Sequence, residues 1–263
     1  MCLELEVDPL FPSSWRSTHN QVNSMKKQKP LLLFFFFCVL LSSRAQQPFQ
    51  NLDFESANLT GYSPGSYVPI NMALPGWTGY YSSSNGTIQA TQVAYEGLSL
   101  GGASISIVDS NAYPPLQGNY SVFLFGGGAN PLFGGESGVL YSPTISQTGS
   151  VPDGTLSLQV MMRWQDVTPL VALNGQTITM VPLETFPNYT LYGGNISSFA
   201  GQTVALSISE PLSSGVSFSM LELDNIVFSS QPIPEPSIFG LLALGGLLLR
   251  VRRRLAGLSV WRC

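Results

Sequence analysis

Residues 103–108 have the sequence Ala-Ser-Ile-Ser-Ile-Val, and residues 203–208 have the sequence Thr-Val-Ala-Leu-Ser-Ile. In both stretches apolar side chains alternate with smaller or polar ones, which is the pattern of a β-strand with one buried face. The same alternation recurs at 120–125 and 154–160. No segment longer than ten residues between 46 and 231 has helical periodicity. These stretches therefore predict an all-β domain.

Turn-forming pairs separate the expected strands at short intervals. The best hairpin signal among them is Asn174-Gly175, because both positions tolerate positive φ. Many short strands with Gly- and Pro-rich turns are typical of a sandwich, and we expect a jelly-roll-like β-sandwich of two antiparallel sheets. The turn pairs are Asn85-Gly86, Pro114-Pro115, Asp153-Gly154, Asn174-Gly175 and Gly193-Gly194.

The N-terminal region has the three parts of a secretory signal peptide. Three lysines precede the apolar core 31–41, which ends at Ser43-Arg44-Ala45, so we expect cleavage after Ala45. Residues 1–24 form a polar leader that signal peptides do not normally carry, and we expect translation to begin at Met25. The alternative is that 34–41 remains as an uncleaved anchor.

The C-terminal region combines a proline motif, a short apolar run and a basic cluster. Pro234, Glu235 and Pro236 lead into the apolar run 238–249. As a helix this run is about 18 Å long at ~1.5 Å per residue, whereas a bilayer span needs roughly 17–25 apolar residues. We expect the basic cluster to stay on the cytoplasmic side. The cluster consists of Arg250, Arg252, Arg253 and Arg254.

The order of these elements over 233–254 closely resembles the PEP-CTERM sorting signal of exported bacterial proteins. The resemblance implies recognition by the membrane enzyme exosortase, cleavage near the motif, and passage to the cell surface or extracellular matrix. The tail 255–263 departs from the family pattern, because it is longer than usual. The alternative is an ordinary single-span membrane anchor. Both place the body of the protein outside the cytoplasm.

These features predict five segments along the chain. They are a misassigned or disordered leader at 1–24, a signal peptide at 25–45, a β-sandwich ectodomain at 46–231, a sorting signal or transmembrane helix at 232–254, and a tail at 255–263.

The expected ectodomain is strongly acidic. One arginine, Arg163, stands against eleven Asp and Glu residues, which gives the segment 46–231 a net charge of −10 although the whole chain has −4. Such a surface disfavours nucleic acid, whose binding depends on Lys and Arg. The chain's cysteines, lysines and only histidine all lie outside this segment, so disulfides, a Ser-His-Asp triad, a Schiff-base lysine and histidine metal sites are excluded from it.

Five short motifs resemble jelly-roll modules of the galactose-binding and carbohydrate-binding type. They include an opening strand at 51–55 (Asn-Leu-Asp-Phe-Glu), a turn at 74–77 (Leu-Pro-Gly-Trp), and a closing strand at 223–228 (Leu-Asp-Asn-Ile-Val-Phe). The stretches 117–122 and 171–175 supply two further matches. In such modules, an opening-strand Glu and a closing-strand Asp commonly share a structural calcium ion.

The resemblance therefore implies a calcium site at Glu55 and Asp224, with Asp53 and Asn225 as weaker candidates. Calcium takes carboxylate and carbonyl oxygens, which two paired strands can supply. The alternative is that Glu55 and Asp224 cap turns or face water.

Sugar binding needs exposed aromatic rings, and the sequence offers one turn-rich cluster at Trp77, Tyr80 and Tyr81. An aromatic residue in a β-sandwich belongs more often to the core. With these three residues as candidate contacts, we expect an exported, non-catalytic structural or adhesive protein, and extracellular polysaccharide is a candidate partner.

The alternative is a glycan-active enzyme with paired carboxylates, a chemistry that needs no histidine. Glu96, Asp109 and Glu136 are its candidate acids, because they lie near glycine-rich loops.

Overall fold

The computed structural model of the 263-residue chain describes residues 47–97, 102–129, 134–212 and 217–234. Within these ranges the chain folds into two β-sheets with a single four-residue α-helix, which confirms an all-β sandwich-like domain. No helix among the described residues is long and apolar enough to cross a membrane. The expected leader, signal peptide, apolar run, arginine cluster and tail lie outside the described residues, as do Glu235 and Pro236.

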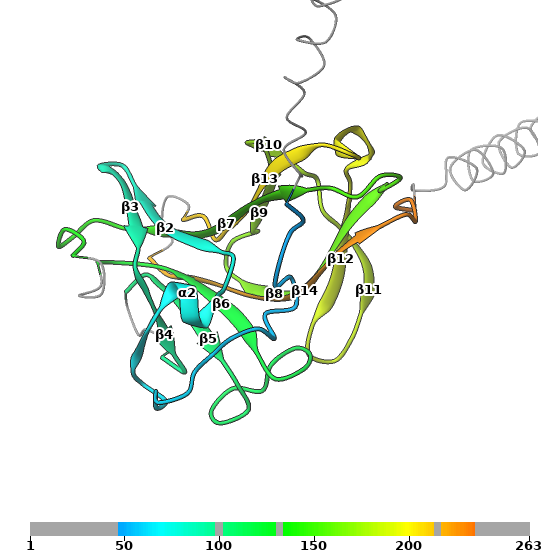
Figure 1. Cartoon of the computed structure of the whole chain (residues 1–263). Helices are drawn as coiled ribbons and strands as arrows, with labels where there is room; N and C mark the ends of the chain where they lie inside the picture. The colour runs from blue at the N-terminus through cyan, green and yellow to red at the C-terminus, as the bar shows by residue number, and fades with distance from the viewer. Residues whose placement is uncertain (1–46, 98–101, 130–133, 213–216, 235–263) are drawn as a thin grey trace, which may run out of the picture. The chain divides into compact units, whose positions relative to one another are not determined.

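The larger sheet has eight strands (Figure 1). The closing strand β14 lies inside it, between β6 and β8. In spatial order its strands are β1 (Tyr67–Pro69), β4 (Gln92–Tyr95), β5 (Ser104–Val108), β6 (Ser121–Gly126), β14 (Ser219–Ser229), β8 (Ser157–Gln165), β12 (Thr190–Asn195) and β11 (Val181–Thr185).

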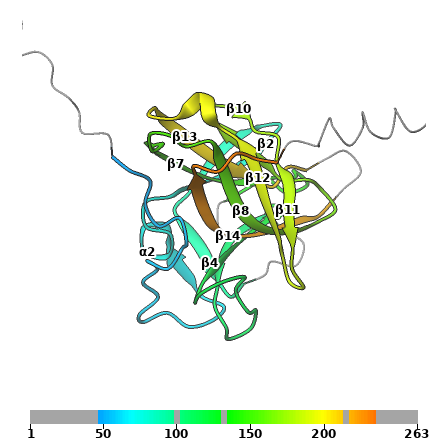
Figure 2. The same cartoon turned by 90° about the vertical axis from the view of Figure 1, so that its right-hand side faces the viewer.

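The smaller sheet has six strands. In spatial order they are β10 (Gln176–Thr177), β9 (Leu170–Leu173), β13 (Thr203–Ser209), β7 (Ser142–Ser150), β2 (Thr78–Ser83) and β3 (Gly86–Ala90). The short helix α2 (Ile70–Ala73) precedes β2, and a 3₁₀ turn (Ser197–Phe199) precedes β13. Figure 2 shows β11 and β12 side by side on the face turned toward the viewer.

Local turn chemistry explains the hairpin between β9 and β10. Leu173 pairs with Gln176, so Asn174 and Gly175 are the two loop residues, with φ of 49° and 77°. Positive φ at both loop positions matches the right-handed twist of the strands, and the predicted hairpin is confirmed. One detail of the expected sheets is wrong, because β4 and β5 pair in parallel, Ala94 with Ser106.

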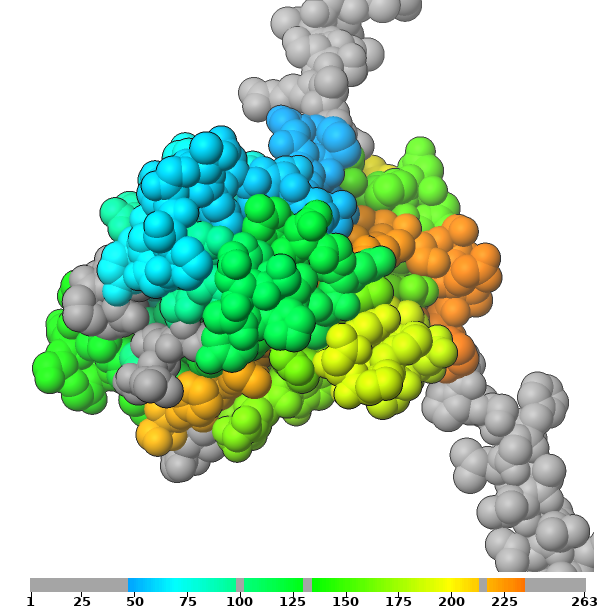
Figure 3. All heavy atoms as spheres, turned by 90° about the horizontal axis from the view of Figure 1, so that it is seen from below, coloured from blue at the N-terminus to red at the C-terminus, as the bar shows by residue number. Residues whose placement is uncertain are grey.

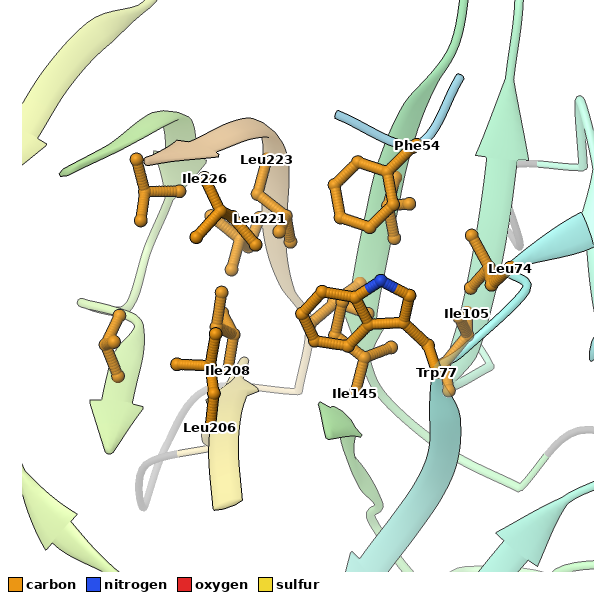
Figure 4. Close-up of a cluster of buried hydrophobic side chains, with 14 of the residues drawn as sticks. Phe54, Leu74, Trp77, Ile105, Ile145, Leu206, Ile208, Leu221, Leu223 and Ile226 are labelled. Atoms are coloured by element: carbon orange, nitrogen blue, oxygen red, sulfur yellow. The ribbon is translucent and has the colours of Figure 1, made fainter. Parts of the chain in front are cut away.

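The core lies between the sheets and follows the alternation of the sequence. On β13 the side chains of Val204, Leu206 and Ile208 are buried, whereas those between them are less so. Figure 4 shows such residues from both sheets converging, together with the rings of Phe54 and Trp77. The predicted strand at 103–108 is almost wholly buried, because its outer face is covered as well.

The opening segment does not form the expected first strand. Residues 51–55 form a turn in which Asn51 and Phe54 have φ of 50° and 57°. The turn still reaches the closing strand, since the backbone N–H of Ile226 donates to the carbonyl of Leu52 at 2.9 Å. In Figure 3 the blue N-terminal residues lie beside the green residues around 117–120. This packing brings the two ends of the domain to one place.

Candidate functional site

The opening turn, the loop before β6 and the closing strand together line a pocket of about 240 Å³. A bulge in the closing strand helps to shape it. Asn225 has φ of 46° within a β-bulge of β14, where the register with β8 shifts, and such bulges redirect side chains. Its lining residues are Asp53, Glu55, Gln117, Gly118, Asp224 and Asn225. The structure therefore brings all four residues of the expected calcium site together.

The loop before β6 holds the Glu55 carboxylate. Its Oε1 accepts the backbone N–H of Asn119 at 2.7 Å and that of Tyr120 at 3.2 Å, and its Oε2 accepts the Asn119 amide at 2.7 Å. Gly118 makes this approach feasible, because a Cβ at that position would lie 2.1 Å from Glu55 Oε1. The loop thus fixes one carboxylate at the pocket wall.

Asp224, which also lines the pocket, is almost completely buried. Its Oδ2 accepts the Gln117 backbone N–H and the Ser121 hydroxyl, both at 3.0 Å, and its Oδ1 accepts the Asn225 backbone N–H at 2.7 Å. Burial raises the pKa of Asp224 to about 7; its hydrogen bonds oppose this rise, and the negative charge of Glu55 adds to it. The pocket therefore holds negative charge that no cationic side chain within it balances.

The donor set suits a hard cation. The lining residues Asp53, Glu55 and Asp224 carry carboxylates, and Gln117 and Asn225 carry side-chain amides; calcium prefers oxygen ligands of these kinds. In the described ranges, no group of three or more His, Cys, Asp or Glu is arranged to hold a metal. An ion here would therefore need amide or backbone oxygens besides the carboxylates.

The expected sugar-contact cluster does not form an exposed platform. Trp77 is 4% exposed, and its indole N–H donates to the Asn51 carbonyl at 3.0 Å. Tyr81 is 1% exposed, and its hydroxyl accepts the Ile105 backbone N–H at 3.0 Å. Tyr80 is half-buried on β2. The alternation of this strand turns Tyr81 into the core, and Trp77 packs on the Phe54 ring 5.7 Å away.

Two of the three candidate acids meet. The Asp109 backbone N–H donates to Glu96 Oε1 at 2.8 Å, and the other oxygen of Glu96, Oε2, is buried without a hydrogen-bond partner among the described residues. Burial raises the pKa of Glu96 to about 7, while interactions with Glu96, Tyr95 and Asn111 outweigh burial and lower the pKa of Asp109. Glu136 lies elsewhere and accepts the Asn85 amide at 2.7 Å.

Two further buried acids carry no motif in the sequence. Glu222 on β14 is fully buried and pairs with the guanidinium of Arg163 on β8, its cross-strand neighbour. Burial raises the pKa of Glu222 to about 7, although Arg163 opposes this. Glu210 is also fully buried, and burial raises its pKa to about 8. In the sequence, both acids alternate with apolar residues, and this is the only sign that they belong to strands. The alternation does not distinguish a buried acid from an exposed one.

Comparison with known proteins does not assign this chain to a family. No family model matches the chain, and no curated protein matches it. Among solved structures, the chain is similar to the enzymatically active domain of tailspike protein 4 from bacteriophage CBA120. The sequences are 11% identical, the TM-score is 0.22, and the match covers 58% of this chain but only 19% of the tailspike chain.

This comparison contradicts one expectation from the sequence. The solved structure is named for enzymatic activity, so the expectation of a non-catalytic protein is withdrawn. At a TM-score of 0.22 the likeness assigns neither an activity nor a substrate to this chain.

Proposed function

We propose that this chain is an exported cell-envelope or extracellular-matrix protein whose jelly-roll-like sandwich is a structural or adhesive module braced by calcium. The observation that carries the proposal is the pocket shared by Glu55 and Asp224, which come from opposite ends of the domain. A divalent ion there would offset the buried negative charge and tie the opening turn to the closing strand. From β6 onward the chain crosses repeatedly between the two sheets, which supports the jelly-roll assignment.

The calcium proposal is tested by thermal unfolding of the full chain in mild detergent, in millimolar calcium and in chelator. We expect calcium to raise the melting temperature, since a ligand at 100 times its Kd stabilises by about 2.7 kcal/mol. Glu55→Gln and Asp224→Asn should abolish the rise, whereas Glu184→Gln, an exposed acid outside the pocket, should keep it. A wild-type melting temperature that ignores calcium would refute the ion site.

Export rests on the terminal motifs, and mass spectrometry of the native protein's two ends tests it. We propose that an exosortase-type enzyme cuts near Pro234-Glu235-Pro236 after the apolar run has entered the membrane. An N-terminus at Gln46 and a C-terminus near Pro236 are the expected result. An intact Cys263 would instead mean that the C-terminal segment is retained as a membrane anchor.

A second candidate function is hydrolysis of a glycan, and one observation favours it. Glu96 has a pKa of about 7 beside a carboxyl whose pKa is lowered, which is how an acid and a base are separated at neutral pH. This candidate ranks second, because neither Glu96 nor Asp109 lines the pocket described above. Polysaccharide hydrolysis that Glu96→Gln abolishes would establish it, and no hydrolysis by the wild type would eliminate it.

A further inference from the structure

A second pocket lies at the end of the molecule formed by β8, β11 and β12. Its volume is about 370 Å³, and four aromatic side chains line it. Trp164 lies on β8, Tyr192 lies on β12, and the other two rings lie at the tip of the β11–β12 hairpin. This tip is closed by the Phe186 backbone N–H, which donates to the Tyr189 carbonyl at 2.8 Å.

The strand register explains why the rings converge. Met162 on β8 pairs with Thr190, and Val160 pairs with Tyr192, so these four side chains share one face of the sheet. Trp164 lies two residues beyond Met162 on this face. Met162 is buried in the core, whereas Trp164 and Tyr192 are half-buried. The core-facing side of the sheet therefore continues into an open pocket.

The rings form two pairs. The centroids of Trp164 and Tyr192 lie 4.4 Å apart with planes inclined by 42°, and those of Phe186 and Tyr189 lie 4.7 Å apart and are stacked. Each pair holds its members against rotation. Flat apolar surfaces of this kind are held in place before any ligand arrives, which lowers the entropic cost of binding.

Polar groups in the same pocket have no protein partner. Among the described residues, no hydrogen bond involves the indole N–H of Trp164, the hydroxyls of Tyr189 and Tyr192, or the Asn188 amide. Half-buried Trp and Tyr usually find a partner for their polar atom. A ligand with apolar faces and many hydroxyl groups would satisfy both the rings and these donors and acceptors.

Charge selects among such ligands. Arg163 reaches the pocket wall, but its guanidinium is paired with the buried Glu222. It is also the only basic residue between 46 and 231, a segment with eleven acids. The surrounding field therefore repels anions, and Arg163 brings no free positive charge to the rings, because it pairs with Glu222 on the other face of the sheet from Trp164.

We propose that this pocket binds a neutral hexopyranose unit of a glycan, with the sugar ring stacked on the Trp164–Tyr192 pair and its hydroxyls bonded to Asn188 and Tyr189. The pocket's volume lies within the roughly 300–1,000 Å³ usual for small-ligand sites. A sugar bound here would be the ligand of the adhesive function proposed above. This inference therefore rests on that proposed function, which includes export of the domain. Its residues are not shared with the calcium pocket.

The test is a glycan array with the full chain in mild detergent, followed by titration calorimetry with the best neutral oligosaccharide. Trp164→Ala and Asn188→Ala should each weaken binding at least tenfold. Tyr192→Phe keeps the ring and removes only the hydroxyl, so it should cost less than the loss of Trp164. Tyr67→Ala removes an exposed ring outside the pocket and should leave the affinity unchanged.

Circular dichroism and the melting temperature of each variant separate lost binding from lost folding. Because Asn188 is exposed, its variant should fold normally even where Trp164→Ala does not. Binding should persist in chelator and in Glu55→Gln, so a failure of the calcium proposal leaves this result intact. An array that is silent, prefers anionic glycans, or responds equally to wild type and Asn188→Ala would overturn the proposal. Binding of a proline-rich peptide at the same rings in place of a sugar would also overturn it.

Discussion

Glu96 Oε1 accepts the backbone N–H of Asp109 at 2.8 Å, which couples the titration of the two carboxyl groups. The Tyr95 hydroxyl donates to Asp109 Oδ2 at 2.6 Å, and the Asn111 backbone N–H donates to Asp109 Oδ1 at 2.8 Å. These donors favour the ionised form of Asp109, so Glu96 is the acid that keeps its proton.

This arrangement predicts that Glu96→Gln stabilises the protein above neutral pH. The pKa of Glu96 is about 7 in the folded protein and lies near 4.5 without the surrounding structure. The folded state therefore holds an extra proton between these values, and wild-type stability falls as pH rises through 7. The glutamine amide carries no charge at any of these pH values. Urea titrations should show little difference at pH 5 and a gain of about 2 kcal/mol at pH 8.

An equal effect of Glu96→Gln at both pH values would contradict the raised pKa of Glu96. Glu136→Gln is the matched control, because that acid lies outside the pair and accepts the Asn85 amide instead. Its pH profile should run parallel to that of the wild type.

Glu210 predicts a second loss of stability at higher pH. Burial raises the pKa of Glu210 from 4.5 to about 8, and the charge of Asp166 adds to the rise. The stabilisation is complete below pH 4.5, where both states are protonated, and it is lost as the pH rises through 8, where the folded state also releases the proton. Glu210→Gln should flatten the stability profile between pH 4.5 and 8, with a gain of about 3 kcal/mol at pH 9. A variant that follows the wild-type slope would refute an uncharged Glu210.

Trp77 is expected to matter for folding rather than for recognition. Its ring packs beside Phe54, and its N–H is bonded to the Asn51 carbonyl. Trp77→Ala should lower the free energy of unfolding by about 3–5 kcal/mol, as large-to-small core changes do. Tyr80→Ala, at a half-buried position on the following strand, should cost clearly less. Comparable losses in chemical unfolding would contradict the burial of Trp77.

The ion pair of Arg163 and Glu222 predicts non-additive effects. Arg163→Ala leaves a buried carboxylate without its partner and should cost about 3 kcal/mol. Glu222→Gln removes that charge, so the double variant Arg163→Ala/Glu222→Gln should be more stable than Arg163→Ala alone. A double-mutant cycle measured by urea unfolding gives the coupling energy. Additive losses would mean that the pair contributes no interaction of its own.

Local patterns predicted the parts of the fold that depend on neighbouring residues. Alternation located β5, β6 and β13, and Asn174-Gly175 located a hairpin, because both signals reflect backbone geometry within a few residues. The parallel pairing of β4 with β5 was missed, since it depends on which strands meet after folding. The sequence predicts a strand at 51–55, where the structure has a turn. The left-handed φ of Asn51 and Phe54, which forms this turn, has no clear signature in the sequence.

The sites show the same division. The sequence predicts that Glu55 and Asp224 lie close together only through the resemblance of whole motifs to jelly-roll modules. Such a resemblance carries information about tertiary structure that single residues lack. The aromatic pocket was missed, because Trp164 and Tyr192 become neighbours only through the pairing of β8 with β12. Trp77 and Tyr81 were placed at the surface because turn residues flank them, whereas the strand's alternation turns Tyr81 inward.

The hydrogen bond from Ile226 to Leu52 sets the order in which this domain can be completed. Strand β14 is the last element of the domain to be synthesised, yet it lies between β6 and β8 in the middle of the larger sheet. Until it arrives, β6 and β8 lack their shared neighbour, and the opening turn lacks its hydrogen bond from Ile226. The sandwich therefore closes only after nearly the whole domain has been made, and such distant pairing is slow. The export proposed above would benefit from this delay, because a chain that is still unfolded can pass through a membrane pore.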